Sequence, residues 1–406
     1  MKKIALAALA TTMLTAGFSG AARAETIGVT MSAFDDNFLT VLRNGMQDYA
    51  ATLDGVELQI EDAQDDVSRQ MSQIQNFIAS GVDAIIVNMN TSFGIDIAEA
   101  LKVPAIMTAL QPINSTSEFP LSMYYVADDL GPALNKLSYT AATVQQAYWN
   151  LPRNKLRREL MGLDSRVMGG IFTNTDGSPL TTLYAYSGVV SPRPHDWPKT
   201  AIVSGYWTLK DRSGWEPSEA FKAFLSAGEA PVYIGFGSMP FGAERNTRIL
   251  REAVDMWGGR AVVARGWGGI DPRDLPDTIF AIDKAPHDKL FRYVSAVVHH
   301  GGAGTTSAGL HLGRPTFVVP QAMDQPYWGR RVSELGCGPK PVRLRKLTSE
   351  ILAQALADLT TNESYRRNAA DLAEVLHAED GLNAAITVIE KSIATHVPRS
   401  IKARRT

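Results

Sequence analysis

The sequence has little cysteine, little net charge and no long apolar run. Cys337 is the only cysteine in 406 residues, which excludes an intrachain disulfide and a cysteine-based metal cluster and predicts a small core residue. A formal net charge of -2 gives no electrostatic basis for binding nucleic acid. No stretch has the apolar length that a membrane-spanning helix needs. A soluble globular protein is therefore expected, and its length favours two domains.

Histidine is missing from the first part of the chain, because all seven histidines lie at or after His195. A histidine base or metal ligand before that position is excluded. Around the paired His299 and His300, no further ligands stand at metal-site spacing, so no metal is predicted. A Ser–His–Asp hydrolase is also excluded, because the sequence has no nucleophile elbow.

The N-terminus has the pattern of a secretory signal peptide over residues 1–24. Lys2 and Lys3 form a charged start, residues 4–16 are mainly apolar, and Ala22–Ala24 supplies a small-x-small cleavage site. The apolar part is too short to span a membrane. We therefore expect an exported, periplasmic chain.

From Glu25 onward, apolar runs alternate with segments of helical periodicity. Strands are expected at 26–31, 56–60 and 83–87, and helices at 37–53 and 66–79. This order predicts a parallel sheet with right-handed crossovers, and hence an α/β fold. The same alternation continues to about residue 395.

The stretch from Ala296 to Gln325 carries the strongest functional pattern. An apolar run is followed by His299 and His300, a glycine-rich turn, a helix start and a second apolar run at 316–319. Open α/β sheets bind ligands at the carboxyl ends of their strands, and free N–H groups at a helix N-terminus attract phosphate. A tight glycine turn without a ligand is the alternative. His300 favours the phosphate site, whereas His299 alone is expected to be a core or surface residue.

Several segments resemble the family-1 glycosyltransferases of the sterol and antibiotic type. The resemblance covers about residues 92–395 and is carried by segments 92–101, 118–120, 191–194 and 215–217, and by His300–Thr306. It implies two Rossmann-like domains that face each other, the GT-B architecture. It also implies an inverting transfer of a hexose from a nucleotide-diphosphate sugar to a hydroxyl of a lipophilic or small-molecule acceptor. The nucleotide sugar is the co-substrate, and no cofactor is expected.

The resemblance assigns roles to residues of the second domain. The donor diphosphate would contact Ser238, His300, Gly302, Ala303, Gly304 and Thr305. The donor sugar would contact Asp324 and Gln325, whose carboxylate and amide together accept from and donate to neighbouring hydroxyls. The nucleotide base would lie near Trp267, Ala285 and His287. Two alternatives stay open: Ser238 as a simple helix cap and Trp267 as a buried core residue.

Residues 25–90 resemble a different family, the periplasmic sugar-binding proteins of the ribose and inositol type. The resemblance implies that Phe34, Asp36 and Phe38 follow the first strand in a sugar-binding loop. The alternative places the two phenylalanines in the core and uses residues 35–37 as a helix cap. We prefer this alternative, because the sequence has no second matching lobe.

The chain therefore has the organisation of a fusion with a hybrid first domain. The expected segments are a signal peptide (1–24), a sugar-binding-protein-like segment (25–90), the rest of an acceptor domain with its linker (91–198), a donor-binding domain (199–395) and a basic tail (396–406). Pro152 is expected to end a helix at 134–151. The proline-rich segment 191–199 is expected to be a linker, and the basic residues between Arg153 and Arg158 a solvated helix face.

The fusion has two consequences for function. The family's base is a histidine in the first-domain loop, and this chain has none there, so the catalytic base is unassigned and only Asp35 or Asp36 can replace it. Nucleotide sugars are cytoplasmic, whereas the signal peptide predicts export. The first hypothesis is therefore a glycosyltransferase, impaired by loss of its base. The alternatives are a non-catalytic nucleotide-sugar binder and a sugar-binding protein of the transport type.

Overall fold

A computed structural model of the chain describes most residues between 25 and 395. The described ranges are 25–31, 37–64, 66–87, 94–123, 129–166, 172–174, 177–208, 214–237, 242–264, 275–283 and 285–395, without the side chains of 37–41, 67–68, 145–152, 156 and 160. The chain divides into two compact units, Met1–Gly94 and Ile95–Thr406. The signal peptide, the expected join near residue 90 and the basic tail lie outside the described residues.

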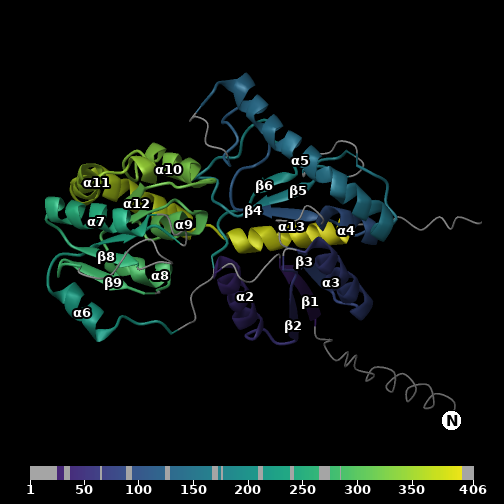
Figure 1. Ribbon diagram of the computed structural model, residues 1–406, viewed down its shortest axis with the longest axis horizontal. Helices are drawn as coiled ribbons and strands as arrows, with labels where there is room; N and C mark the ends of the chain where they lie inside the picture. Colours follow the sequence, from purple (N-terminus) through teal and green to yellow (C-terminus); the bar gives the residue numbers. More distant parts are fainter. Residues whose placement is uncertain are drawn as a thin grey trace, which may run out of the picture. The chain divides into compact units, whose positions relative to one another are not determined.

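The first unit contains a parallel three-stranded sheet, as predicted. Its strands are β1 (Glu25–Met31), β2 (Val56–Asp62) and β3 (Ala84–Val87), in the order β2-β1-β3, and its helices are α2 (Asn37–Ala50) and α3 (Val67–Ser80) (Figure 1). Helix α3 packs closely on β1, because a Cβ atom at Gly28 would lie 2.6 Å from the ring of Phe77. Glycine at this position thus permits the contact between helix and sheet.

The second unit begins with helix α4 (Gly94–Leu101) and a second parallel sheet. This sheet has the order β4-β5-β6, with strands β4 (Ile106–Ala109), β5 (Thr181–Tyr184) and β6 (Ala201–Val203). Helix α5 (Pro132–Met161) runs unbroken through residue 152. The prediction that Pro152 ends a helix is therefore wrong, because a proline removes one helical hydrogen bond and packing elsewhere along a long helix outweighs that loss.

A buried ion-pair network corrects the expected solvated basic face. Asp96 is fully buried and accepts hydrogen bonds from Arg153 Nε at 2.5 Å and Nη2 at 2.8 Å. Arg157, also buried, forms an ion pair with Asp96 and with Glu99. Only Arg158 of these arginines is exposed. Two guanidinium groups thus face inward because the two carboxylates of Asp96 and Glu99 on α4 balance their charge.

The remaining strands form a five-stranded parallel sheet. They are β7 (Val232–Gly235), β8 (Ala261–Ala264), β9 (Ile279–Ile282), β10 (Ala296–His299) and β11 (Thr316–Val318), in the order β11-β10-β7-β8-β9. The helices are α6 (Glu219–Ser226), α7 (Ala243–Trp257), α8 (His287–Leu290), α9 (Ala303–His311), α10 (Gln325–Glu334), α11 (Ser349–Thr361), α12 (Glu363–His377) and α13 (Gly381–Thr395), with short 3₁₀ helices η1 (Phe291–Tyr293) and η2 (Leu344–Lys346).

Both faces of the five-stranded sheet are covered. Side chains alternate along β7, so Val232 and Ile234 pack with α7 and α11, whereas Tyr233 packs with α6 and α8. Figure 1 shows α7 and α11 on one side of the strands and α6 on the other. Every residue of β7 and of β10 is buried. The positions at which these strands end are therefore held rigidly from both sides.

The segment 191–199 is not a loose linker. Arg193 donates to the backbone oxygens of Ala201, Trp197 and Pro198. Trp197 is buried and stacks on Tyr184 with ring centroids 4.6 Å apart. The expected linker is thus fixed to the sheet that β5 and β6 form. As expected, Cys337 is buried. Among the described helices, none combines the length and apolarity needed to cross a membrane.

Candidate functional site

The site lies where the strand order of the five-stranded sheet reverses. The chain runs from β7 outward through β8 to β9 and then returns to β10 on the other side of β7. The loops that follow β7 and β10 therefore leave in opposite directions. In open α/β sheets the ligand crevice forms at this switch point, outside the carboxyl ends of the strands. His300 follows β10 and Gly237 follows β7, so both stand at that crevice.

The imidazole of His300 is held between two glycines. A Cβ atom at Gly237 would lie 2.8 Å from Cε1 of His300, and one at Gly302 would lie 2.6 Å from Nε2. Gly237 also has a φ of +77°, which favours glycine. Burial lowers the pKa of His300 to about 4. The ring is therefore neutral near pH 7, with one N–H to donate, and its Nδ1 is buried without a partner among the described residues.

Helix α9 begins directly beside His300 with uncapped amides. Its N-cap residue is Gly302, which has no side chain to cap the helix, and the first intrahelical bond runs from Thr306 N to the Gly302 carbonyl. The backbone N–H groups of residues 302–305 consequently have no partner within the helix. Together with the helix dipole, these amides favour an anion at this position. The predicted residues His300, Gly302, Ala303, Gly304 and Thr305 are thus brought together.

His299 has a structural role, as expected. Its ring is fully buried, and its Nδ1 accepts a hydrogen bond of 2.9 Å from the backbone N–H of Gly301. Gly301 has a φ of +93°, and a Cβ there would meet Val318 and the Gln325 carbonyl. This bond fixes the tautomer of His299, since Nδ1 must carry the lone pair. The turn between β10 and α9 is therefore built on His299 and Gly301.

Asp324 and Gln325 stand at the start of α10. Asp324 is the N-cap residue, its carboxylate accepts a 2.8 Å hydrogen bond from Trp328 Nε1, and burial raises its pKa. The Gln325 side chain is almost fully buried, and its Oε1 accepts from the backbone N–H groups of Gln321 and Ala322. Gln325 therefore also holds the loop before α10. Their predicted contacts with a sugar remain predictions.

The predicted nucleotide-base region is partly described. His287 is half-buried, and its ring stacks on Phe291 with centroids 4.7 Å apart. Burial lowers the pKa of His287 to about 4, and the neighbouring His300 adds to this effect. Ala285 is half-buried. Packing thus accounts for the His287 ring, and its predicted role beside a base stays untested.

Other predicted residues lie outside the part of the chain that the structure describes. They are Phe34, Asp35, Asp36, Ser238 and Trp267, and the side chain of Phe38 in α2 is also not described.

One polar residue of the site was missed from the sequence. Gln321 follows β11, and its Nε2 donates a 2.8 Å hydrogen bond to the carbonyl of Phe236, at the end of β7. Gln321 therefore links the ends of β11 and β7, the two strands on either side of β10. A polar residue directly after the proline that closes the strand at 316–319 was the available signal.

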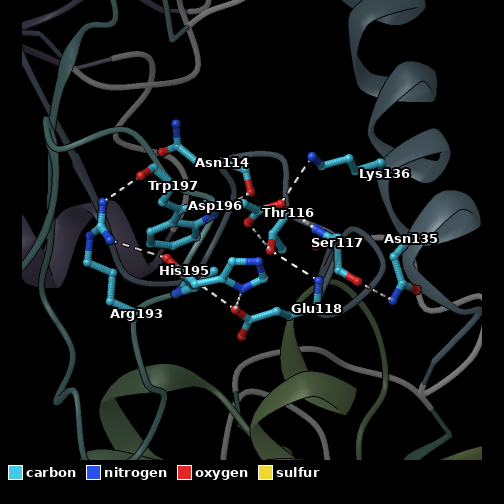
Figure 2. Close-up of polar contacts among 11 residues, drawn as sticks. Asn114, Thr116, Ser117, Glu118, Asn135, Lys136, Arg193, His195, Asp196 and Trp197 are labelled. Atoms are coloured by element: carbon cyan, nitrogen blue, oxygen red, sulfur yellow. Dashed lines mark hydrogen bonds and ion pairs between the residues drawn. The ribbon is translucent and has the colours of Figure 1, made fainter.

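A second polar cluster, drawn in Figure 2, joins Glu118, His195 and Asp196. Their ligand atoms lie within 4.8 Å of one another, as a metal site requires. Asp196, however, accepts hydrogen bonds from Thr116 Oγ1 and Ser117 N at 2.7 and 2.9 Å. Lys136 Nζ lies 3.2 Å from the same carboxylate. Its oxygens are thus already bonded to donors, and a nearby ammonium opposes a cation.

The pKa of Asp196 also indicates a structural cluster and not a metal site. Burial raises the pKa of Asp196, but the bonds from Thr116 and Ser117 and the Lys136 ammonium outweigh it and lower the pKa to about 2. His195 Nδ1 lies 2.5 Å from Glu118 Oε1, and both side chains are exposed. The cluster therefore fastens the 116–118 loop to the 193–197 segment.

Two family models each match a part of the chain. Residues 258–385, which include the His300 turn and α10, match the family described as erythromycin biosynthesis protein CIII-like, C-terminal domain. Residues 27–109 match the family described as periplasmic binding protein domain. This second match runs past residue 90 to the end of β4, beyond the segment expected from the sequence.

Curated relatives agree with the first of these matches. The sterol 3-beta-glucosyltransferase UGT80B1 of Arabidopsis thaliana is 36% identical over 322 residues, which cover 78% of this chain and 51% of that protein. A sterol 3-beta-glucosyltransferase of Cryptococcus neoformans is 32% identical over 341 residues, covering 77% of this chain and 21% of the relative. Over this region the chain is similar to sterol 3-beta-glucosyltransferases. It spans about half the length, or less, of these curated relatives.

Solved glycosyltransferase structures share the fold. The glycotransferase of kitacinnamycin superposes with a TM-score of 0.62 at 17% identity, covering 91% of this chain and 99% of that one. The glycosyltransferase VinC, in complex with dTDP, has a TM-score of 0.57 at 18% identity with the same coverage. The predicted fold class, two Rossmann-like domains of the GT-B type, is confirmed.

Proposed function

We propose that the protein transfers a hexose from a nucleotide-diphosphate sugar to a hydroxyl group of a lipophilic acceptor such as a sterol. The observation that carries this proposal is that two sets of free hydrogen-bonding groups lie together. They are the neutral His300 ring, whose Nδ1 has no partner among the described residues, and the backbone amides of residues 302–305, which no side chain caps. These donors converge at the switch point of the sheet, where a diphosphate fits. The sterol glucosyltransferase relatives support the choice of donor and acceptor.

The crevice supplies what departure of a diphosphate requires. Negative charge grows on the leaving diphosphate as the bond to the sugar breaks, and preorganised hydrogen-bond donors stabilise that charge. The amides of α9 and one N–H of His300 supply such donors without reorganisation. We infer that Ser238 adds a hydroxyl donor, that Asp324 and Gln325 bind the sugar, and that no resident cofactor is needed.

Removal of the acceptor proton needs a base. We propose Asp35 or Asp36 for this role, because they follow β1 in a chain with no histidine before His195. Replacement of the aspartate that acts as the base by asparagine should then lower the turnover number while donor affinity stays unchanged. Wild-type turnover in both Asp35→Asn and Asp36→Asn would exclude these residues.

The cellular location is proposed from the N-terminal residues and from where the donor is made. Residues 1–24 have the pattern of a signal for export, whereas nucleotide sugars are made in the cytoplasm. We propose that the chain is exported to the periplasm and that transfer requires the fraction that meets donor before export. Fractionation of cells that produce the full chain, with a blot of the periplasmic and cytoplasmic fractions, tests this location.

Replacement of His300 by alanine tests the proposed function. His300→Ala should lower the rate of hexose transfer to a sterol by about 100-fold, the effect of one such donor on turnover. It should lower the affinity for uridine or thymidine diphosphate about tenfold, the effect of one lost hydrogen bond to a charged group. Calorimetry measures binding, and radiolabelled donor measures transfer. His377→Ala, on the exposed side of α12, is the matched control.

The outcomes separate the proposed function from its alternatives. Transfer by the wild type and its loss in His300→Ala support a glycosyltransferase. Binding without transfer identifies a non-catalytic nucleotide-sugar binder. Tight binding of free ribose or inositol, with no nucleotide binding, would identify a transport-type sugar-binding protein.

A further inference from the structure

Gln321 is fixed at both its backbone and its side chain. Its backbone N–H donates 2.7 Å to Gln325 Oε1, and its own Nε2 donates 2.8 Å to the Phe236 carbonyl. These bonds connect the loop before α10 with the end of β7. The side chain is therefore positioned before any ligand arrives.

The orientation of the Gln321 amide follows from its partner. A carbonyl oxygen only accepts hydrogen bonds, so the atom that faces Phe236 O must be the nitrogen. The other atom, Oε1, is consequently an acceptor. It is buried and has no hydrogen-bond partner among the described residues. A buried acceptor without a partner destabilises the protein, and native structures contain few of them.

A second atom without a partner, Nδ1 of His300, lies close in space to the end of β7. Gly237 follows Phe236, and a Cβ at Gly237 would lie 2.9 Å from Nδ1 of His300. That Nδ1 is also buried without a partner among the described residues. The end of β7 thus touches two groups with unused hydrogen-bonding capacity, one of them an acceptor only.

The chemistry of the acceptor restricts what can bind to it. The diphosphate of a nucleotide sugar carries oxygen acceptors and no hydroxyl protons near neutral pH, so the Gln321 oxygen cannot accept a hydrogen bond from it. A sugar hydroxyl can donate to that oxygen. Asp324, the predicted sugar ligand, lies three positions further along the same loop.

We propose that Gln321 is a specificity-determining residue whose Oε1 accepts a hydrogen bond from one hydroxyl group of the donor sugar. This inference rests on the proposed function and assigns the loop before α10 a part in choosing the sugar. Gln321 binds the sugar and leaves the nucleotide to other residues.

The test compares a nucleotide with its sugar conjugate. Titration calorimetry on the full chain measures uridine diphosphate and uridine diphosphate glucose for the wild type, for Gln321→Met and for the control Gln354→Met on the exposed side of α11. Methionine keeps the length of glutamine and removes both polar atoms. Gln321→Met should weaken the sugar conjugate about tenfold, the effect of a lost buried hydrogen bond, with the nucleotide unchanged. The control should bind like the wild type.

A donor series gives a second readout that does not depend on how well the variant folds. Glucose conjugates that lack one hydroxyl each are titrated into both proteins. One of these deoxy conjugates should bind to the wild type about tenfold more weakly than the glucose conjugate does. In Gln321→Met the two conjugates should bind with equal affinity. That coupling identifies the hydroxyl that Gln321 contacts.

The remaining outcomes overturn distinct statements. If the wild type binds both compounds and Gln321→Met weakens them equally, or changes neither, Gln321 has no role in sugar recognition. If the wild type binds neither compound nor the thymidine counterparts, the proposed donor site itself fails, and the role of Gln321 fails with it.

Discussion

The three-stranded sheet of the first unit and the five-stranded sheet of the second are both parallel but differ in how firmly they hold their strand ends. In the five-stranded sheet, β7 and β10 are buried along their full length between helices on both faces. In the first unit the sheet has three strands, and Ile86 in β3 is 48% exposed. A preorganised anion site needs fixed strand ends, which β7 and β10 of the five-stranded sheet supply.

The two units also differ in their titrating and fluorescent groups. All seven tryptophans and all seven histidines lie at or after Trp149, so none belongs to residues 1–94. Tryptophan fluorescence therefore reports on the second unit alone. Hydrogen exchange of β1 and α3 peptides reports on the first. With these two probes, each prediction below can be assigned to one unit.

The largest effect is expected from Asp96→Asn in the second unit. Asp96 is fully buried and is the shared partner of Arg153 and Arg157. Its neutralisation leaves buried guanidinium charge uncompensated, which should lower the free energy of unfolding by about 3–5 kcal/mol. Urea unfolding followed by tryptophan fluorescence measures this loss.

Asp164→Asn is the control for that experiment, because its side chain is exposed. Peptides of β1 and α3 should keep their wild-type exchange protection in both variants. An equal loss of protection in those peptides would show that the two units unfold together, and the comparison between them would then be wrong.

Acid should destabilise the second unit next most strongly. The pKa values of His287 and His300 are lowered to about 4 by burial, from an ordinary 6.5. Between pH 4 and pH 6.5 the unfolded chain binds protons that the native state excludes. The stability that the two neutral histidines contribute is therefore complete above pH 6.5 and is lost as the pH falls toward 4. We expect each of the two histidines to contribute a loss of about 2 kcal/mol by roughly pH 5.

Fluorescence-detected unfolding at several pH values tests this expectation. His287→Phe keeps the stacking on Phe291 and removes one titrating group, so stability should fall less steeply with acid in that variant. An unchanged slope would mean that His287 is protonated in the native protein.

How far the sequence predicts this molecule depends on the separation of interacting residues. The strand–turn–helix around His300 is local, so its pattern is visible in the sequence. Arg153 was misplaced because its partner Asp96 lies 57 residues away, and Gln321 was missed because it bonds to Phe236, 85 residues away. The unbroken α5 shows a tertiary environment overriding the local effect of Pro152.

The glycines around His300 provide a third and smaller effect. Alanine at Gly302 places a Cβ 2.6 Å from Nε2 of His300, whereas alanine at Gly45 in helix α2 meets nothing within 4 Å. Gly302→Ala should displace the imidazole and weaken binding of uridine diphosphate about tenfold, roughly the value of one hydrogen bond to a charged group. Gly45→Ala lies outside the predicted diphosphate site, is the control and should bind normally. Equal weakening in both would show that the effect does not come from His300.

The smallest effect is expected in the first unit, at Thr30. Its hydroxyl donates a 2.7 Å buried hydrogen bond to Gln73 Oε1, whose Nε2 in turn donates to the Asp62 carbonyl. Thr30→Val keeps the shape and leaves Gln73 Oε1 without a donor, at a cost of about 1 kcal/mol. Exchange of β1 and α3 peptides should accelerate about fivefold while tryptophan fluorescence unfolding stays unchanged. A shift in the fluorescence transition would instead show that the first unit contributes to the stability of the second, and the contrast between the two sheets would be wrong.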